Sequence, residues 1–372
     1  MVRREFLAGL AGARLLRPEE LPASFSDYTP EFQIEAQDAN PRVRCYDLRR
    51  LTGVQPETGE FFIFHQARTV APVDLALWRL GISGCVARPM TLTMSDLLRR
   101  RAVDTATVFE CSGNSGHAQL MNGLVGQATW SGPALAPVLR ECGVLPEARE
   151  VVFFGMDGGT ERKWAAREQD MFAPHGRSIF IQDAMKGSVM LATRMNGAPL
   201  PPDHGFPLRA IVPGWYGMTN VKWLNRILVL DRRYEGRHMA RNYHSIRSSD
   251  SLTVESSISR MRLKSVVTRV VRQGPTMVVH GAAWTGGPAV TKVEVRVNDL
   301  EWEEATVHSG PNASSWKLWN VELPNIGRGT HRVVSRATDR AGAVQPDPAE
   351  WRKTFASSRE DHSQWTRTVV LA

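Results

Sequence analysis

Residues 109–116 have the sequence Phe109-Glu110-Cys111-Ser112-Gly113-Asn114-Ser115-Gly116, and they follow an apolar run that starts at Thr105. The change from apolar to small and polar residues predicts a strand that delivers Cys111 to a loop. The two glycines allow a sharp turn and a close approach of a bulky group to the backbone. Cys111 is therefore a candidate ligand or nucleophile at the floor of a pocket. A small core residue is the alternative for a single cysteine after a strand.

The composition is that of a globular chain with room for two domains. The chain has 372 residues, of which 42% are hydrophobic and 23% charged, and this length is enough for two cores. The formal net charge of +8 indicates an acidic partner or an anionic ligand. Because arginine and lysine are spread along the chain rather than clustered, we predict no nucleic-acid partner.

The cysteines and the apolar runs exclude two classes of protein. The four cysteines are Cys45, Cys85, Cys111 and Cys142. This spacing suits neither a disulfide scaffold nor a Cys-x-x-Cys zinc site, so we predict no structural disulfide. No apolar run approaches the roughly 20 residues needed to cross a bilayer, so we predict no transmembrane segment.

Residues 1–20 resemble a twin-arginine export signal. Arg3 and Arg4 stand before an apolar stretch from Phe6 to Ala13, which Arg14 interrupts. The stretch is short for such a signal, so a degenerate signal or a plain basic helix start is the alternative. A working signal predicts a periplasmic protein, and a failed one predicts a cytoplasmic protein.

Two short helices are expected in the first half of the chain. Ser95 is the expected cap of a helix over residues 96–100. A second helix is expected over residues 133–142, with Pro133 in its first turn and Gly143 as its stop.

Two further strands end in polar residues. The apolar run Phe61–Phe64 is closed by His65, and the buried strand predicted over residues 151–154 is followed by Asp157 among glycines. Such an ending brings a polar group to an open edge. A tight surface turn is the equal alternative for Asp157.

Residues 199–224 are dense in proline and glycine, which fix the shape of the backbone. His204, Arg209 and Lys222 stand on this segment. Histidine, arginine and lysine held on a fixed backbone suit an anionic, hydrogen-bonding ligand such as a phosphate. The alternatives are a histidine that satisfies a core carbonyl and two solvated cations.

The character of the chain changes after Asp231. Residues 232–251 are charged, rich in serine and without periodicity, which predicts a linker. Beyond them Val293, Val295 and Val297 alternate with polar residues, as in a half-buried strand. Similar runs occur at residues 276–280, 316–323, 331–337 and 366–371. Short strands at this spacing predict an antiparallel sandwich of immunoglobulin type.

Together these motifs resemble the sulfite oxidase family of molybdenum enzymes, from about Tyr46 to the end of the chain. In that family a cysteine within Cys-(Ala/Ser)-Gly-Asn binds molybdenum, which implies that Cys111 is the metal ligand. The resemblance implies an α+β fold: a mixed molybdopterin-binding domain with an N-terminal arm over residues 21–250, then an all-β immunoglobulin-like dimerisation domain over residues 251–372. It also implies that molybdopterin is held by His65, Cys111, Asp157, His204, Arg209, Asn220, Val221 and Lys222.

The chemistry of these residue types agrees with the resemblance. A thiolate joins the soft dithiolene of molybdopterin around the metal, and histidine, arginine and lysine suit its pterin edge and phosphate. The implied reaction is oxygen-atom transfer: oxidation of sulfite or a related sulfur compound, with water as the oxygen source. The sequence has no heme motif such as Cys-x-x-Cys-His and no flavin or nicotinamide loop. The resemblance therefore implies a homodimer that passes electrons to a separate carrier, such as a c-type cytochrome.

The expected substrate pocket departs from the family. Two arginines that sulfite oxidases place around the substrate correspond here to Ile63 and Gly116, the family's tyrosine to His175, and an arginine of its C-terminal domain to Lys317. Losing two guanidinium groups costs several kcal/mol, at roughly 1.5 to 3 for each charged hydrogen bond. The loop looks closer to the sulfane dehydrogenase branch. We expect a less charged sulfur compound, with His175, Arg177 and Lys317 as substitute donors.

Two other functions are alternatives to the oxidation of a sulfur compound. A reductase of sulfoxides or other oxo-compounds would run the same chemistry backwards, but those relatives generally lack the C-terminal sandwich. A cofactor-free binding protein could use the same fold, since a fold can outlive its function. Retention of Cys111 together with the histidines and cations of the expected site argues against it.

Overall fold

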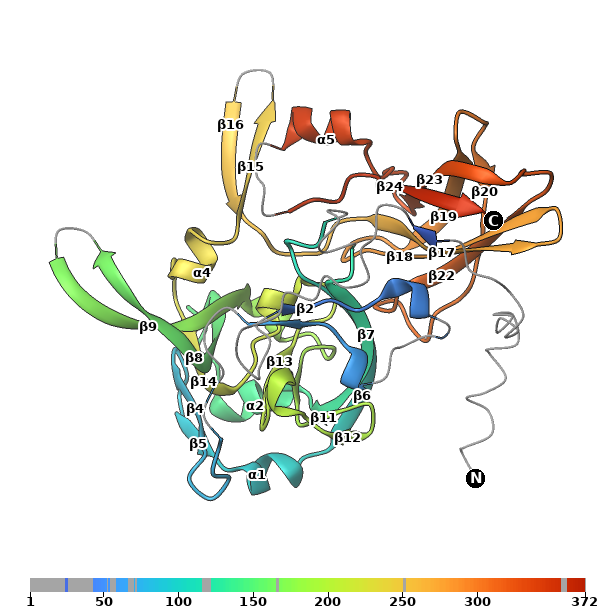
Figure 1. Ribbon diagram of the computed structural model, residues 1–372. Helices are drawn as coiled ribbons and strands as arrows, with labels where there is room; N and C mark the ends of the chain where they lie inside the picture. The colour runs from blue at the N-terminus through green and yellow to red at the C-terminus, as the bar shows by residue number, and fades with distance from the viewer. Residues whose placement is uncertain are drawn as a thin grey trace.

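The computed structural model describes residues 24–25, 43–51, 53, 58–65, 70, 72–115, 122–164, 167–249, 252–355 and 360–371. The chain is mostly β with a few short helices, and the α+β prediction is confirmed to that extent. The strands of the C-terminal third form one unit beside the rest of the protein (Figure 1). The expected export signal over residues 1–20 lies outside the described residues, as does the expected arm apart from residues 24–25.

A five-stranded sheet forms one side of the first domain. Its order is β5 (Met90–Leu92), β4 (Leu80–Gly84), β14 (Leu224–Leu230), β8 (Glu150–Trp164) and β9 (Arg167–Phe180). Short helices pack their apolar side chains on it, namely α1 (Met94–Leu98), α2 (Leu135–Cys142) and α3 (Ile181–Ala184). Leu97 and Leu139 meet Phe153 and Ile227 in this core, and all four are almost fully buried. The predicted buried strand over residues 151–154 is therefore present but longer than expected.

The two predicted helices are present with shifted starts. Thr93, not Ser95, caps α1, because its side chain accepts from the Asp96 amide while Asp96 accepts from the Thr93 amide. This reciprocal capping box is available only to Thr93. Helix α2 ends at Gly143 as predicted, with φ of 68°. It begins after Pro133, because that residue is the last of strand β7.

A second sheet delivers the cysteine loop. Its order is β12 (Ala198–Pro199), β11 (Arg194–Met195), β7 (Val125–Pro133) and β6 (Ala102–Glu110). Two short pairs lie beside it, β10 (Met190–Ala192) with β13 (Arg209–Ile211), and β2 (Val43–Arg44) with β3 (Ile63–Phe64). Phe61 packs edge-on against Phe109 and Trp130, with ring centroids 6.3 and 6.0 Å away. Because β6 ends at Glu110, Cys111 starts the loop, as predicted.

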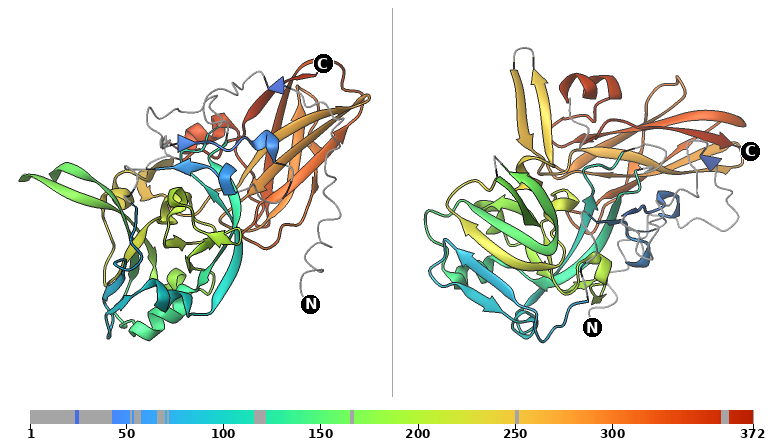
Figure 2. Two further views of the ribbon diagram at one scale, coloured as in Figure 1. Left: turned by 60° about the horizontal axis from the view of Figure 1, so that its bottom comes forward. Right: turned by 60° about the vertical axis from the view of Figure 1, so that its left-hand side comes forward.

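Residues 232–249 are structured, contrary to the linker predicted over residues 232–251. They contain helix α4 (Arg237–Ala240) and strand β15 (His244–Ser249), which pairs with β16 (Leu252–Ser257). This hairpin stands out from the body beside α5 (Pro348–Thr354), as Figure 2 shows. The domain boundary predicted between residues 250 and 251 falls between its two strands.

The C-terminal domain is a sandwich of two antiparallel sheets. One has the order β17 (Lys264–Gln273), β18 (Thr276–Trp284), β22 (Lys317–Leu323) and β21 (Thr306–Val307). The other has the order β1 (Ser24–Phe25), β24 (Thr366–Leu371), β23 (Gly329–Asp339), β19 (Val290–Val297) and β20 (Glu303–Glu304). The alternation along β19 is confirmed, since Val293, Val295 and Val297 are buried in the shared core. The immunoglobulin type of this sandwich stays a prediction.

Two exclusions can be checked against the described residues. All four cysteines are free, so the prediction of no disulfide is confirmed. Among the helices of the described residues, none has the length and apolar character required to span a bilayer.

Candidate functional site

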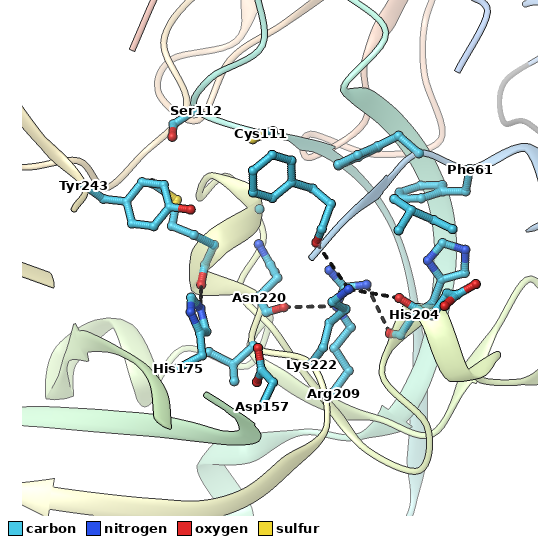
Figure 3. A pocket seen from close by; sticks show the side chains of 17 residues that line it. Phe61, Cys111, Ser112, Asp157, His175, His204, Arg209, Asn220, Lys222 and Tyr243 are labelled. Carbon is cyan, nitrogen blue, oxygen red and sulfur yellow. Dashed lines mark hydrogen bonds between the residues drawn. The ribbon is translucent and has the colours of Figure 1, made fainter. Parts of the chain in front are cut away.

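One cavity in the first domain gathers residues from many separate elements (Figure 3). It contains about 660 Å³ of empty space, counting its open mouth. Its lining is Phe61, Phe62, Ile63, Phe64, Cys111, Ser112, Asp157, His175, Asp203, His204, Arg209, Gly217, Met218, Asn220, Val221, Lys222 and Tyr243.

Cys111 reaches the cavity from the end of β6. Its amide donates to the Leu124 carbonyl at 2.9 Å, and its carbonyl accepts from the Asn114 amide at 2.9 Å, which closes a turn. Burial raises the pKa of the Cys111 thiol to about 12. The polypeptide by itself therefore favours the thiol, and a thiolate here needs a cation at the sulfur. Within the described residues no group of three or more His, Cys, Asp or Glu side chains is placed to hold a metal ion.

Asp157 and His175 meet because the β8–β9 hairpin contains a wide bulge. Phe154 pairs with Gly176, yet Gly158 pairs with Pro174, so three residues of β8 lie opposite one residue of β9. The strand was expected to end at residue 154, and instead it resumes after the bulge. Bulges of this kind re-aim side chains next to functional sites. Here the bulge places Asp157 in the cavity beside His175.

His175 is a neutral hydrogen-bond acceptor toward the cavity. Its Nε2 lies 2.9 Å from the Met218 carbonyl oxygen, and since a carbonyl only accepts, Nε2 carries the proton. Burial lowers the pKa of His175 to about 4. Nδ1 therefore has a lone pair at neutral pH, and this buried atom has no partner among the described residues. The role of His175 as a donor to the substrate stays a prediction.

Arg209, on β13, is a buried cation held by backbone carbonyls. Its Nε donates to the Asn220 carbonyl at 3.0 Å, and its Nη1 to the His204 carbonyl at 3.2 Å. The guanidinium carbon lies 4.9 Å from the centroid of the Trp130 ring. Burial lowers the pKa of Arg209 to about 9, so it remains charged at neutral pH. In the described part of the chain no carboxylate lies within salt-bridge distance of it.

Lys222 is the second cation of the cavity, and it is partly buried. Its Nζ donates to the carbonyls of Asp203 and Phe64 at 3.0 and 3.3 Å. Burial lowers the pKa of Lys222 well below its usual value, and burial also raises the pKa of Asp157 to about 6, against the opposing charge of Lys222. His65 lies just behind this group, with Nε2 3.3 Å from the Asp203 carbonyl oxygen.

His204 stands in the short helix η4 (Pro202–His204), which Gly205 ends. Gly205 has φ of 109°, and a Cβ there would lie 3.0 Å from the Lys222 Cα. Only glycine allows the turn to approach Lys222 so closely. Burial lowers the pKa of His204 to about 3, and Arg209 adds to that shift. His204 is therefore neutral at pH 7.

Asn220 and Val221 follow the short helix η5 (Gly217–Thr219) and line the cavity. The Asn220 side chain is fully occupied by the fold. Its Oδ1 accepts from the Val212 amide at 2.7 Å, and its Nδ2 donates to the carbonyls of Trp215 and Tyr216. Asn220 therefore shapes the loop, and its own carbonyl positions the cation on β13.

Three predicted site residues are not in the described lining, namely His65, which lies behind Lys222, Arg177 and Lys317. Arg177 is fully buried, and its two Nη atoms donate to the carbonyls of His238 and Ile258. Lys317 is the first residue of β22, opposite Ala283 on β18. Gly116 lies outside the described residues. The catalytic roles of Arg177 and Lys317 stay predictions.

Sequence reasoning missed Tyr243, which comes from the segment interpreted as a linker. It lines the cavity, is 4% exposed, and its ring centroid lies 5.9 Å from the Arg177 guanidinium carbon. One signal was available: Met239 and Tyr243 are apolar residues four apart on a basic background, and both are buried.

Comparisons with known proteins agree with this geometry. A family model described as "oxidoreductase molybdopterin binding domain" matches residues 67–238, and one described as "Mo-co oxidoreductase dimerisation domain" matches residues 247–358. Mitochondrial sulfite oxidase of Drosophila melanogaster is 34% identical over 332 residues, which cover 78% of this chain and 55% of that protein. The chain belongs to the sulfite oxidase family. Its matched domains are the molybdopterin-binding and dimerisation domains of molybdenum-cofactor oxidoreductases.

Other relatives and a solved structure extend the comparison. Human mitochondrial sulfite oxidase is 30% identical over 75% of this chain and 55% of its own length. Nitrate reductase of Hordeum vulgare is 29% identical over 87% of this chain and 43% of its own. This chain thus spans about half the length of these curated relatives. The sulfane dehydrogenase SoxCD of Paracoccus pantotrophus has the same fold, with a TM-score of 0.77 at 24% identity over 94% of this chain and 90% of that one.

The cavity fits molybdopterin. Three buried lining atoms have no hydrogen-bond partner among the described residues, namely Ser112 Oγ, Asp157 Oδ1 and His175 Nδ1. An unsatisfied buried polar atom costs about 1 to 3 kcal/mol, so a ligand that bonds to these atoms is favoured. Arg209 and Lys222 supply charge for a phosphate, and Cys111 supplies a soft sulfur for molybdenum.

Proposed function

We propose that this protein oxidises sulfite or a related sulfur compound by oxygen-atom transfer. The compound takes one oxygen atom from water, and two protons and two electrons are released. The observation that carries the proposal is one cavity that holds the Cys111 thiol together with two cations, the buried Arg209 and the partly buried Lys222. The names of its relatives, sulfite oxidase and sulfane dehydrogenase, support a sulfur substrate.

The chain divides the work among its residues. Cys111 would hold the metal, while Arg209, Lys222 and His204 would hold the pterin and its phosphate. Bound molybdopterin supplies the two-electron oxygen-transfer chemistry. His175 accepts a hydrogen bond through Nδ1, which suits water or a protonated substrate group. Asp157, with its pKa raised to about 6, can take up a proton near neutral pH.

Much of the lining of the cavity is uncharged. Phe62, Ile63, Met218 and Tyr243 line it, and no arginine side chain other than Arg209 is in the described lining. A desolvated dianion needs charged donors, so this surface favours a sulfur compound that has less charge than sulfite. A sulfur group bound to a carrier would be of this kind.

Metal analysis tests the proposal most directly. Protein from a host that makes the cofactor should contain about one molybdenum per chain, and Cys111→Ser should contain far less. The matched control is Cys45→Ser, a half-buried cysteine outside the described lining. Wild-type protein without molybdenum would refute the proposal.

Substrate assays then test the reaction. With an artificial electron acceptor, we expect faster turnover of a protein-bound sulfane than of sulfite, and slow turnover of thiosulfate, which is also a dianion. Assays with sulfoxides and a reductant measure the reverse direction. Oxidation of sulfite with micromolar affinity would overturn the proposal that the substrate has less charge than sulfite.

The proposal extends to the partners of the enzyme. We propose a homodimer through the dimerisation domain and an acidic electron carrier such as a c-type cytochrome, in the periplasm if residues 1–20 direct export. The net charge of +8 would attract such a carrier. Its reduction rate should then fall as ionic strength rises, because salt screens charges beyond about 8 Å at 0.15 M. A reduction rate independent of salt concentration would contradict the proposal that the carrier is acidic.

A further inference from the structure

A buried ion pair joins the two domains directly beside Cys111. Lys264 is the first residue of β17, and its Nζ lies 2.9 Å from Glu110 Oε1. The two side chains are only 2% and 1% exposed. Because desolvation opposes the attraction in a buried pair, such a pair adds little stability by itself. A fully bonded buried network does specify one geometry.

The C-terminal domain occupies both oxygens of the Glu110 carboxylate. Lys264 donates to Oε1, and Trp284 Nε1 donates to Oε2 at 2.8 Å. Lys264 and Trp284 are directly opposite each other on β17 and β18. Their side chains therefore leave the same face of the sheet and reach the same carboxylate from two directions.

The ammonium group of Lys264 also holds the far side of the cysteine turn. It donates to the Asn114 carbonyl at 2.7 Å and to the Asp361 carbonyl at 2.8 Å. Asn114 in turn donates through Nδ2 to Glu110 Oε1 at 3.1 Å and through its amide to the Cys111 carbonyl. One cation thus binds the residues on both sides of Cys111, with all three of its protons used.

We propose that Lys264 is a positioning residue for the Cys111 sulfur. Through Lys264 and Trp284 the dimerisation domain fixes the turn that presents Cys111 to the cavity. The resemblance placed a different cation of the C-terminal domain, Lys317, at the substrate, whereas Lys264 contacts the cysteine turn. The inference rests on Cys111 being the metal ligand of the proposed function.

The test compares Lys264→Met with a matched control, Arg262→Met. Arg262 pairs at 3.1 Å with Glu360, which is 1% exposed, so the control also leaves a buried carboxylate unpaired. No described contact joins Arg262 to the turn at residues 110–114. In cofactor-free protein, iodoacetamide should alkylate Cys111 about tenfold faster in Lys264→Met, because the turn loses its charged hydrogen bonds. The control should keep the wild-type rate, as peptide mass mapping would show.

The loaded enzyme gives a second readout. In Lys264→Met the electron paramagnetic resonance spectrum of the molybdenum should change and kcat should fall while KM stays the same, with neither change in the control. Lys264→Arg should restore part of the spectrum. Equal alkylation rates and unchanged spectra in both variants would overturn the proposal.

Two further results would also be decisive. If Lys264→Met does not fold, Glu110→Gln and Glu360→Gln form the deciding pair, with faster alkylation expected only in the first. Wild-type protein without molybdenum would refute the proposed function. Faster alkylation in the variant would still support the positioning of Cys111, because that measurement needs neither cofactor nor substrate.

Discussion

The side chains that line the cavity include two groups that differ in charge. We call Arg209 and Lys222 the cationic wall, and the uncharged residues Phe62, Ile63, His175, Met218 and Tyr243 the neutral wall. The cations of the first wall are retained because backbone carbonyls bond to them. On the second wall burial lowers the pKa of His175 and leaves the ring uncharged. The difference supports the proposal that the cavity binds an anion at the cationic wall and a reactant of low charge at the neutral wall.

The largest effect is expected from removing a cation. Arg209→Met keeps the apolar contact with Phe109 and Trp130 but loses the guanidinium. Retention of molybdopterin should weaken by about a hundredfold, because two charged hydrogen bonds contribute roughly 3 kcal/mol or more. Molybdenum per chain after dialysis measures this.

The control for that experiment is Arg194→Met. Arg194 is an exposed residue of β11 outside the described lining, so its variant should keep a wild-type metal content. If Arg209→Met also kept its molybdenum, the cationic wall would have no part in binding the cofactor.

The neutral wall predicts a loss of stability in acid. The pKa of His175 is lowered from 6.5 in the unfolded chain to about 4 in the folded chain. Between pH 4 and pH 6.5 His175 is therefore protonated in the unfolded chain and neutral in the folded chain. The stabilisation is complete above pH 6.5 and is lost as the pH falls toward 4. Going from pH 7 to pH 5 should cost about 2 kcal/mol of unfolding free energy from this residue.

Urea denaturation of cofactor-free protein at both pH values measures that loss. His175→Phe should show a smaller difference between pH 7 and pH 5 than the wild type, whatever its stability at pH 7. An unchanged difference would mean that His175 is not held neutral by burial.

A charge introduced into the neutral wall should change the substrate preference. Ile63→Arg places a guanidinium at a lining position, and kcat/KM for sulfite should rise about tenfold, the effect of one charged hydrogen bond. Ile63→Met is the uncharged control and should leave kcat/KM for sulfite near the wild-type value. A folded, molybdenum-loaded Ile63→Arg enzyme without any gain would mean that charge at this wall does not set the preference.

Local patterns in the sequence predicted the parts of the fold that local forces decide. The alternation of residues 293–297 and the run at residues 366–371 gave the strands β19 and β24, because one buried face imposes a period of two. The loop at Cys111 followed from the end of an apolar run. The residues that line the cavity could be identified for the same reason, since His204, Arg209 and Lys222 stand on one short segment.

Contacts between distant residues decided what the sequence could not show. The bulge that brings Asp157 to His175 depends on the register of two strands. Lys264 and Glu110 are 154 positions apart, and nothing in their own neighbourhoods marks them as partners. Tyr243 lines the cavity but belongs to a segment with no clear periodicity. Such pairings depend on tertiary packing, which a single sequence does not display.

The smallest effect is expected at Lys317, the residue that the resemblance placed at the substrate. Lys317 is half-buried at the start of β22 and is not in the described lining of the cavity. Because a charge outside the cavity is screened by solvent, Lys317→Met should change kcat/KM by less than about twofold, against about tenfold for a charge placed at Ile63. Steady-state rates of the loaded enzyme at two ionic strengths measure this. A large loss of kcat/KM would show that Lys317 contacts the substrate. The C-terminal domain would then add a positive charge to the neutral wall.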